Sequence, residues 1–268
     1  MDTPRNAPEA PAAEDTPSPR KQIAFSGTDP IRAALGELRE ITEDLLPQFG
    51  DEVWNKHSMV TMNVAALSRV LYLNNLYLKI LDVPGVICEF GVQWGATMTQ
   101  LINLRSVYEP FNHSRTIYGF DTFEGFPAVH PQDGNLVRSR DLSTAAGHEQ
   151  TLERILHLME QFPPLPHIKK HALIKGDASH TIDEWLESNP HAIISLAIFD
   201  MDLYAPTKTV LEKIRPRLVK GSVLAFDELN CRYFPGETTA LDEAIGLNNL
   251  RLYRSPHHPF GAWAVFGE

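Results

Sequence analysis

The chain has 268 residues, of which 43% are hydrophobic, and a formal net charge of -10 at pH 7. This length supports one large hydrophobic core with a small appended element. Binding to nucleic acid depends on basic surfaces that neutralise phosphates. The chain is acidic and has no basic stripe, so we expect no nucleic-acid partner.

The sequence also argues against a membrane or secreted protein. No apolar run approaches the roughly 20 residues that span a bilayer, and the N-terminal "MDTPRNAPEAPAAEDTPSPRK" has no apolar stretch of a secretory signal. Two cysteines, Cys88 and Cys231, are too few for a disulfide framework. We expect a cytoplasmic protein with no membrane partner.

The N-terminal third divides into two parts. Residues 1–22 are rich in proline, alanine and acids, which predicts a disordered tail. Residues 23–83 contain two helical patterns, "DPIRAALGELREITEDLL" and "SMVTMNVAALSRVLYLNNLYLKILDV". The second pattern is apolar on more than one face. We predict a helical cap over 23–83, whose apolar surface covers either the core or a homo-oligomer interface.

From residue 84 onward, short apolar runs alternate with helical segments. The runs lie at 86–90, 116–120, 171–175, 193–199, 222–226, 250–254 and 262–266. Such alternation predicts a mostly parallel sheet with helices on both faces. The link between the last two runs is too short for a crossover helix, so these runs should pair as an antiparallel hairpin. Residues 84–268 are therefore predicted to form an α/β, Rossmann-like class I methyltransferase fold with seven strands.

Polar residues follow the first three runs, where ligands bind in open α/β sheets. Gly91 and Gly95 would let a ligand approach the backbone, unless they serve only a tight turn. Asp121 is placed to accept hydrogen bonds from ribose hydroxyls, and Asp177 from an adenine amino group; a helix cap and a turn residue are the alternatives. The pattern describes a nucleoside pocket without a pyrophosphate cradle, which suits S-adenosylmethionine. The candidate cofactor-binding residues are Glu89, Gly91, Gly95, Thr97, Asp121, Thr122, Asp177 and Ala178.

Four acids follow the fourth and fifth runs: Asp200 and Asp202, then Asp227 and Glu228. We expect both strands to lie beside the first strand, so that the four carboxylates converge. Unpaired carboxylates would repel one another and raise each other's pKa. Mg²⁺ removes that conflict, because it favours carboxylate oxygens. The alternative is that some of these acids, Asp202 above all, cap helices.

Four stretches resemble the macrocin O-methyltransferase family of natural-product tailoring enzymes. They are "EFGVQWGAT", "YGFDTFEGFP", "FDMDLYAPTKTVLEKIRPRLVKGSVLAFDEL" and "FPGETTALDEA", and the similarity covers roughly residues 55–268. The resemblance implies S-adenosylmethionine, Mg²⁺ and methyl transfer to a hydroxyl, often on a sugar. It places Asp200, Asp227 and Glu228 on the metal ligands and Asp202 on the catalytic base. The chain departs from the family at Glu228, where aspartate is common, and at Leu229, which replaces a usual tyrosine.

Other assignments remain open at the level of sequence. His57, His148, His257 and His258 are competing candidates for the base. A nicotinamide-dependent oxidoreductase would need a third glycine after Gly95, where the chain has Ala-Thr-Met. A non-catalytic partner protein would have lost the acids at the strand ends. The partner is expected to be a small hydroxylated acceptor, in contact with residues 30–82, 127–168 and 229–238.

Overall fold

The computed structural model describes residues 29–268. The tail predicted at 1–22, and the first residues of the predicted helical cap, lie outside this range. The seven strands form one sheet in the order β3-β2-β1-β4-β5-β7-β6. They are β1 (Val86–Phe90), β2 (Ile117–Asp121), β3 (His171–Lys175), β4 (Ile194–Phe199), β5 (Leu218–Phe226), β6 (Leu252–Arg254) and β7 (Ala262–Val265).

Strands β1 to β5 pair in parallel, and β7 is antiparallel to both β5 and β6. The predicted Rossmann-like methyltransferase fold with its terminal antiparallel pair is thus confirmed. One detail of the prediction was wrong. The fourth and fifth strands were both expected to lie beside the first, but of these two only β4 pairs with β1, and β5 lies one strand further out, paired with β4.

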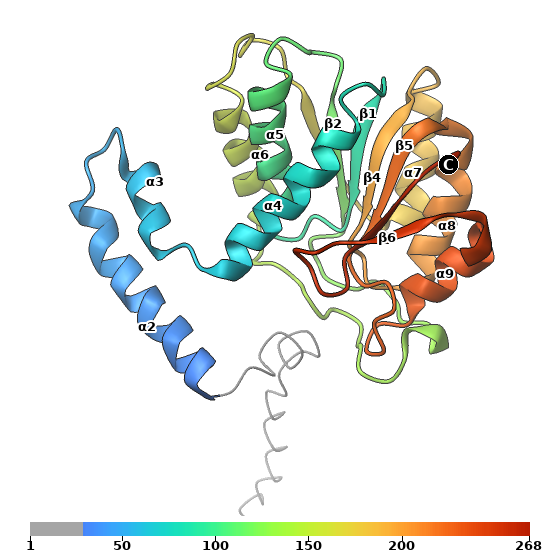
Figure 1. Ribbon diagram of the computed structural model, residues 1–268, viewed down its shortest axis with the longest axis horizontal. Coiled ribbons are helices and arrows are strands. Elements are labelled where there is room, and N and C mark those ends of the chain that lie inside the picture. The colour runs from blue at the N-terminus through green and yellow to red at the C-terminus, as the bar shows by residue number, and fades with distance from the viewer. Residues whose placement is uncertain (1–28) are drawn as a thin grey trace, which may run out of the picture.

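Helices cover both faces of the sheet (Figure 1). One buried cluster joins α4, α5 and α6 to one face, and a second joins α7, α8 and α9 to the other. The helices are α2 (Asp29–Leu45), α3 (Trp54–His57), α4 (Val64–Lys79), α5 (Ala96–Tyr108), α6 (His148–Met159), α7 (Ala178–Ser188), α8 (Tyr204–Ile214) and α9 (Gly236–Ala244). Short 3₁₀ turns lie at η1 (Leu46–Gln48), η2 (Ser58–Thr61), η3 (Pro131–Asp133), η4 (Arg215–Arg217) and η5 (Leu247–Asn249).

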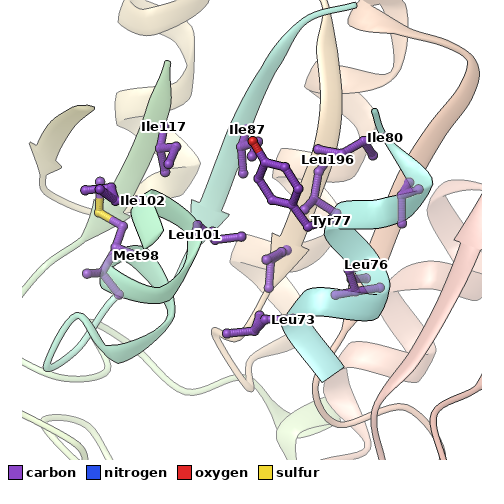
Figure 2. Packing of buried hydrophobic residues seen from close by; sticks show 14 of the residues in the cluster. Leu73, Leu76, Tyr77, Ile80, Ile87, Met98, Leu101, Ile102, Ile117 and Leu196 are labelled. Atoms are coloured by element: carbon purple, nitrogen blue, oxygen red, sulfur yellow. The ribbon is translucent and has the colours of Figure 1, made fainter. Parts of the chain in front are cut away.

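Helix α4 is held firmly against the sheet. Leu73, Leu76, Tyr77 and Ile80 recur at helical spacing and are completely buried. Figure 2 shows them facing α5 and the central strands. At the other end of the helix, the Asn63 side chain accepts a hydrogen bond of 3.0 Å from the Ala66 amide and so caps the first turn. Any side chain on the pocket side of α4 is therefore carried by a fixed backbone.

The first helices make a different arrangement. Helix α2 packs on η1 and η2, and none of its residues is buried. In Figure 1, α2 and α3 stand apart from the sheet, whereas α4 crosses it. Large apolar side chains are exposed on α2 and α3, among them Ile31, Ile41 and Trp54. Of the helices predicted to cap the core, α4 is the one that covers the sheet.

The two glycines after β1 serve packing within the protein. Gly91 has φ +96°, and a Cβ atom on it would lie 2.0 Å from the carbonyl oxygen of Asp200. Gly95 has φ +84°, and its Cβ would lie 2.2 Å from Leu152 Cδ1 on α6. Both positions combine a left-handed backbone with a contact that only glycine permits. The glycines therefore let the β1–α5 turn pack against the loop after β4 and against α6.

We predict that Gly91→Ala lowers the free energy of unfolding by at least about 2 kcal/mol, because the methyl group meets backbone that cannot move aside. Gly36→Ala, in α2, is the matched control, since nothing lies within 4 Å of its Cβ. That control should be neutral or stabilising by about 0.5–1 kcal/mol. Urea unfolding measures both, and equal stability of the two variants would contradict the packing role.

A buried ion network ties α5 to the start of β3. Arg105 Nη2 donates to Glu160 Oε1 at 2.7 Å, and the Lys170 amide donates to the same carboxylate. His171 Nδ1 lies 3.1 Å from Glu160 Oε2. Burial by itself would raise the pKa of Glu160. The contacts with His171, the Lys170 amide and Arg105 outweigh burial and lower that pKa to about 2.

Because of this network, the free energy of unfolding should depend on pH in the acidic range. The pKa of Glu160 in the folded state lies below its usual value of 4.5, so its contribution is complete above pH 4.5 and is lost as the pH falls towards 2. The contribution is on the order of 3 kcal/mol. Wild-type protein should therefore lose more unfolding free energy between pH 6 and about pH 3 than Glu160→Gln does. Glu187→Gln, at an exposed site on α7, should behave like the wild type.

Candidate active site

A cavity of about 370 Å³ opens at the carboxyl ends of the central strands, beside the switch point between β1 and β4. Backbone hydrogen bonds between neighbouring strands continue one residue beyond the strand ends and fix the rim of the cavity. The Gly91 amide donates to Phe120 O at 2.9 Å, the Asp200 amide to Phe90 O at 2.8 Å, and the Asp227 amide to Phe199 O at 3.1 Å. The residues that follow three different strands, β1, β4 and β5, are thereby brought to one edge.

Most of the predicted cofactor-binding residues line this cavity, and Gly95 does not. The lining includes Glu89, Gly91, Thr97, Asp121, Thr122, Asp177 and Ala178, together with the predicted metal ligands Asp200 and Asp227. Glu228 and Asp202 are not part of the lining. Residues that the sequence analysis missed also contribute, among them Arg69, Gln93, Phe126 and Leu142. Their side chains come from a distant helix and from loops without a recognisable pattern.

The Asp121 carboxylate joins two loops. Its Oδ2 accepts a hydrogen bond of 2.7 Å from the Gln93 amide, and its Oδ1 accepts one of 2.5 Å from the Phe123 amide. Both donors have positive φ angles, of 49° and 58°. A carboxylate oxygen accepts more than one hydrogen bond, so Asp121 retains acceptor capacity towards the cavity. Its position is fixed by the protein before any ligand binds.

Glu89 is a buried acid in the cavity wall, with 1% of its surface exposed. Burial raises the pKa of Glu89 well above its usual value, and the nearby Asp200 raises it further, while Arg69 acts against both. Glu89 Oε2 has no hydrogen-bond partner in the part of the chain that the structure describes. A buried polar atom of this kind in a pocket wall indicates a place for a ligand's donor or positive charge.

Asp177 acts as a helix cap. Its Oδ1 accepts a hydrogen bond of 2.9 Å from the Ser179 amide, at the first turn of α7. The alternative expected for Asp177 was a turn residue, so the helix cap is a role that the sequence analysis did not assign to it. The residue still lines the cavity beside Ala178, so capping and ligand contact are compatible there.

Arg69, on α4, lies between the acids that were expected to hold a metal. Its Nη1 donates to Asp227 Oδ1 in a very short contact, and its Nη2 donates to Asp200 Oδ2 at 2.9 Å. Nη2 also donates to Thr97 Oγ1 at 2.9 Å. Burial by itself would lower the pKa of Arg69, but Asp227 and Asp200 raise it above its usual value. The signal that could have revealed it is a lone arginine inside "VAALSRVLYLNNLYL".

The expected Mg²⁺ site does not fit this arrangement. Across residues 29–268, no group of three or more histidine, cysteine, aspartate or glutamate side chains is arranged to hold a metal ion. Asp200 and Asp227 face the Arg69 guanidinium. The third expected ligand, Glu228, lies outside the cavity lining, and its amide donates to Glu237 Oε2 at 2.8 Å. The interpretation of these acids as a Mg²⁺ site is therefore not supported, because a side-chain cation already lies between two of them.

Asp202, the expected base, is 1% exposed and has a left-handed backbone with φ +61°. Its neighbours Met201 and Leu203 both line the cavity. The loop that bears Asp202 thus forms part of the pocket wall, although its carboxylate lies behind the lining. Strained non-glycine backbone of this kind is typical of functional loops.

Of the four histidines considered as bases, only His258 lines the cavity. Its Nδ1 accepts a hydrogen bond of 2.8 Å from the Gly261 amide, and its Nε2 lies 3.7 Å from Asp227 Oδ1. An Nδ1 that accepts from an amide leaves the neutral ring with its proton on Nε2. His258 is therefore not poised to take a proton, and His148 packs on Trp94 instead.

The sequence and the fold of the chain are both similar to those of known proteins. The profile of the macrocin O-methyltransferase (TylF) family matches residues 57–242. The crystal structure of CalS11, a calicheamicin methyltransferase, is 35% identical, covers 96% of this chain and 100% of its own, and superimposes with a TM-score of 0.84. An apo structure of CalS11, described as a TDP-rhamnose 3'-O-methyltransferase in calicheamicin biosynthesis, is 34% identical, with coverages of 92% and 99% and a TM-score of 0.78.

A more distant structure, the O-methyltransferase NovP, is 19% identical, with coverages of 74% and 79% and a TM-score of 0.53, and shares the fold. No curated protein matches the chain. None of the described helices is long and apolar enough to cross a membrane. The family profile covers more than half of the chain, and the likeness to CalS11 extends over nearly all of it. The chain therefore belongs to the macrocin O-methyltransferase family and is an O-methyltransferase.

Proposed function

We propose that this enzyme transfers a methyl group from S-adenosylmethionine to a hydroxyl of a sugar, borne on a nucleotide or on a natural-product intermediate. The likeness to CalS11 over 96% of the chain carries this proposal. The cavity adds support, because a nucleoside-type wall after β1 to β3 meets an acidic wall after β4 and β5. The same site suits a small hydroxylated acceptor better than a macromolecule.

The wall after β1 and β2 has the chemistry for the methyl donor. S-adenosylmethionine supplies a methyl group on a positively charged sulfur, together with an amino acid and a ribose. Glu89 offers a buried oxygen to positive charge or to an ammonium donor. Asp121 is fixed by two backbone amides and retains lone pairs for ribose hydroxyls. Thr97 and Thr122 add hydroxyl groups to the same wall.

In the proposed reaction, the acceptor oxygen attacks the methyl carbon in line with the carbon–sulfur bond. That bond breaks, the electron pair stays on sulfur, and S-adenosylhomocysteine leaves. The cavity walls hold the two reactants in this alignment, which removes part of the entropic barrier. Asp202 is the proposed acceptor of the hydroxyl proton; because its carboxylate lies behind the lining formed by Met201 and Leu203, the proton reaches it through one water molecule. No step passes through Mg²⁺, because the expected ligands do not fit a metal as arranged.

Two alternatives are set aside on the family assignment. A nicotinamide-dependent oxidoreductase and a non-catalytic partner protein both conflict with membership of an O-methyltransferase family over residues 57–242. The acids at the strand ends, whose loss a non-catalytic protein would show, are present at the cavity rim.

The function is tested in two steps. Calorimetry should show one S-adenosylhomocysteine bound per chain and no binding of NADH. Labelled S-adenosylmethionine should then methylate members of a panel of nucleotide-linked deoxysugars and glycosylated macrolides, while catechols serve as the non-sugar comparison. Methylation of catechols alone would overturn the sugar assignment, and failure to bind S-adenosylhomocysteine would overturn the donor.

We predict that Asp121→Ala weakens binding of S-adenosylhomocysteine by about 1–3 kcal/mol, the scale for loss of hydrogen bonds to a charged group. Because Asp121 also holds two loop amides, melting temperature is measured alongside affinity. Asp177→Ala is the comparison, since its carboxylate already caps α7. An unchanged affinity in a folded Asp121→Ala protein would remove Asp121 from the ribose role.

We predict that Asp202→Asn lowers kcat by about 10²–10⁴-fold, the range for loss of a general base, and leaves the affinity for S-adenosylhomocysteine unchanged. The amide keeps the shape of the side chain and cannot accept the proton. Asp183→Asn, at an exposed site on α7, is the control and should retain full activity. A kcat like that of the wild type, with an unaltered pH profile, would assign the base elsewhere.

A further inference from the structure

The acceptor half of the pocket contains a cation that belongs to the chain itself. We infer that the Arg69 guanidinium takes the place of a divalent metal between Asp200 and Asp227, and that methyl transfer by this enzyme needs no divalent cation. The part of this inference that concerns methyl transfer rests on the proposed function. Its main test, metal binding, does not depend on turnover.

The guanidinium is held by three elements at once. Nη1 contacts Asp227 after β5, and Nη2 contacts both Asp200 after β4 and Thr97 on α5. A planar guanidinium with five donors suits this arrangement, whereas an ammonium would act as a single point charge. The two carboxylates are thereby neutralised in part and held in place without a metal.

Arg69 is also fixed from its own helix. The guanidinium carbon lies 5.7 Å from the centre of the Tyr72 ring, a cation–π distance. One turn further along α4, Leu73 is anchored in the core, and Leu76 and Tyr77 are anchored one turn beyond it. The side chain is 24% exposed, so it is neither a loose surface arginine nor fully covered.

A divalent ion and Arg69 would exclude each other. A metal between Asp200 and Asp227 would lie against a guanidinium whose charge cannot be released, since arginine does not deprotonate in proteins. Displacing Arg69 would break three hydrogen bonds and leave a positive side chain beside the metal.

The same geometry leaves the arginine able to serve the reaction. Its hydrogen bonds to Asp227, Asp200 and Thr97 use three of the five N–H donors of the guanidinium. Arg69 lines the cavity on the acceptor side. A hydroxyl oxygen bound there would receive a hydrogen bond from a fixed positive charge, which favours the developing alkoxide.

The first experiment titrates Mn²⁺ into the full chain with S-adenosylhomocysteine bound and follows free Mn²⁺ by electron paramagnetic resonance. Wild-type protein is expected to bind no stoichiometric Mn²⁺. Arg69→Met should gain one Mn²⁺ per chain, because it releases both carboxylates. Lys79→Met, which removes the other basic residue of α4, is the matched control and should gain none.

Three results would overturn the inference. The first is that the wild-type chain binds one Mn²⁺ and that Asp227→Asn loses this binding. The second is that Arg69→Met folds but binds no Mn²⁺. The third is that EDTA abolishes methyl transfer by the wild type and Mg²⁺ restores it. If Arg69→Met does not fold, the wild-type titration with its Asp227→Asn control still decides. Absence of methyl transfer in a protein that binds S-adenosylhomocysteine counts against the proposed function, whereas the Mn²⁺ titration tests the arginine separately.

Discussion

The hydrogen-bond ladder that runs past the ends of the parallel strands is the constraint on which the site depends. Backbone bonds from Gly91 to Phe120, Asp200 to Phe90 and Asp227 to Phe199 set the first residue after each strand at a fixed depth. Because parallel strands end at the same edge, side chains distant in sequence meet there. The glycine at 91 is part of this constraint, since a Cβ would strike the Asp200 carbonyl oxygen.

Carboxylates that lie close together repel one another, and two features of the structure reduce this repulsion. Glu89 is buried, and burial together with the nearby Asp200 raises the pKa of its carboxyl well above the usual value. Asp200 and Asp227 share the charge of Arg69 instead. The wall after β1 therefore carries a buried polar oxygen, while the wall after β4 and β5 carries a paired cation. Helix α4 connects this pairing to the hydrophobic core (Figure 2).

Much of the fold follows from local patterns. The five apolar runs predicted from Val86 to Phe226 became the five parallel strands, because period and flanking polar residues are local properties of the chain. The turn at the end of the sheet was predictable for a similar reason: a seven-residue link cannot carry a crossover helix. Four of the acids placed after the strands also reached the pocket edge, as the switch-point rule requires: Asp121, Asp177, Asp200 and Asp227.

The sequence by itself determined which residues lie at the ends of the strands, and tertiary structure decided what those residues face. Asp227 meets an arginine 158 positions away, and Asp200 meets the same arginine 131 positions away. Local periodicity carries no information about such pairs. Glu228 shows the same limit, since its neighbour Asp227 lines the cavity while Glu228 lies outside the lining. Successive residues after a strand point in different directions, so two residues adjacent in sequence need not share a site. The cation among the acids was placed there only by the packing of α4 over the sheet, since α4 bears Arg69.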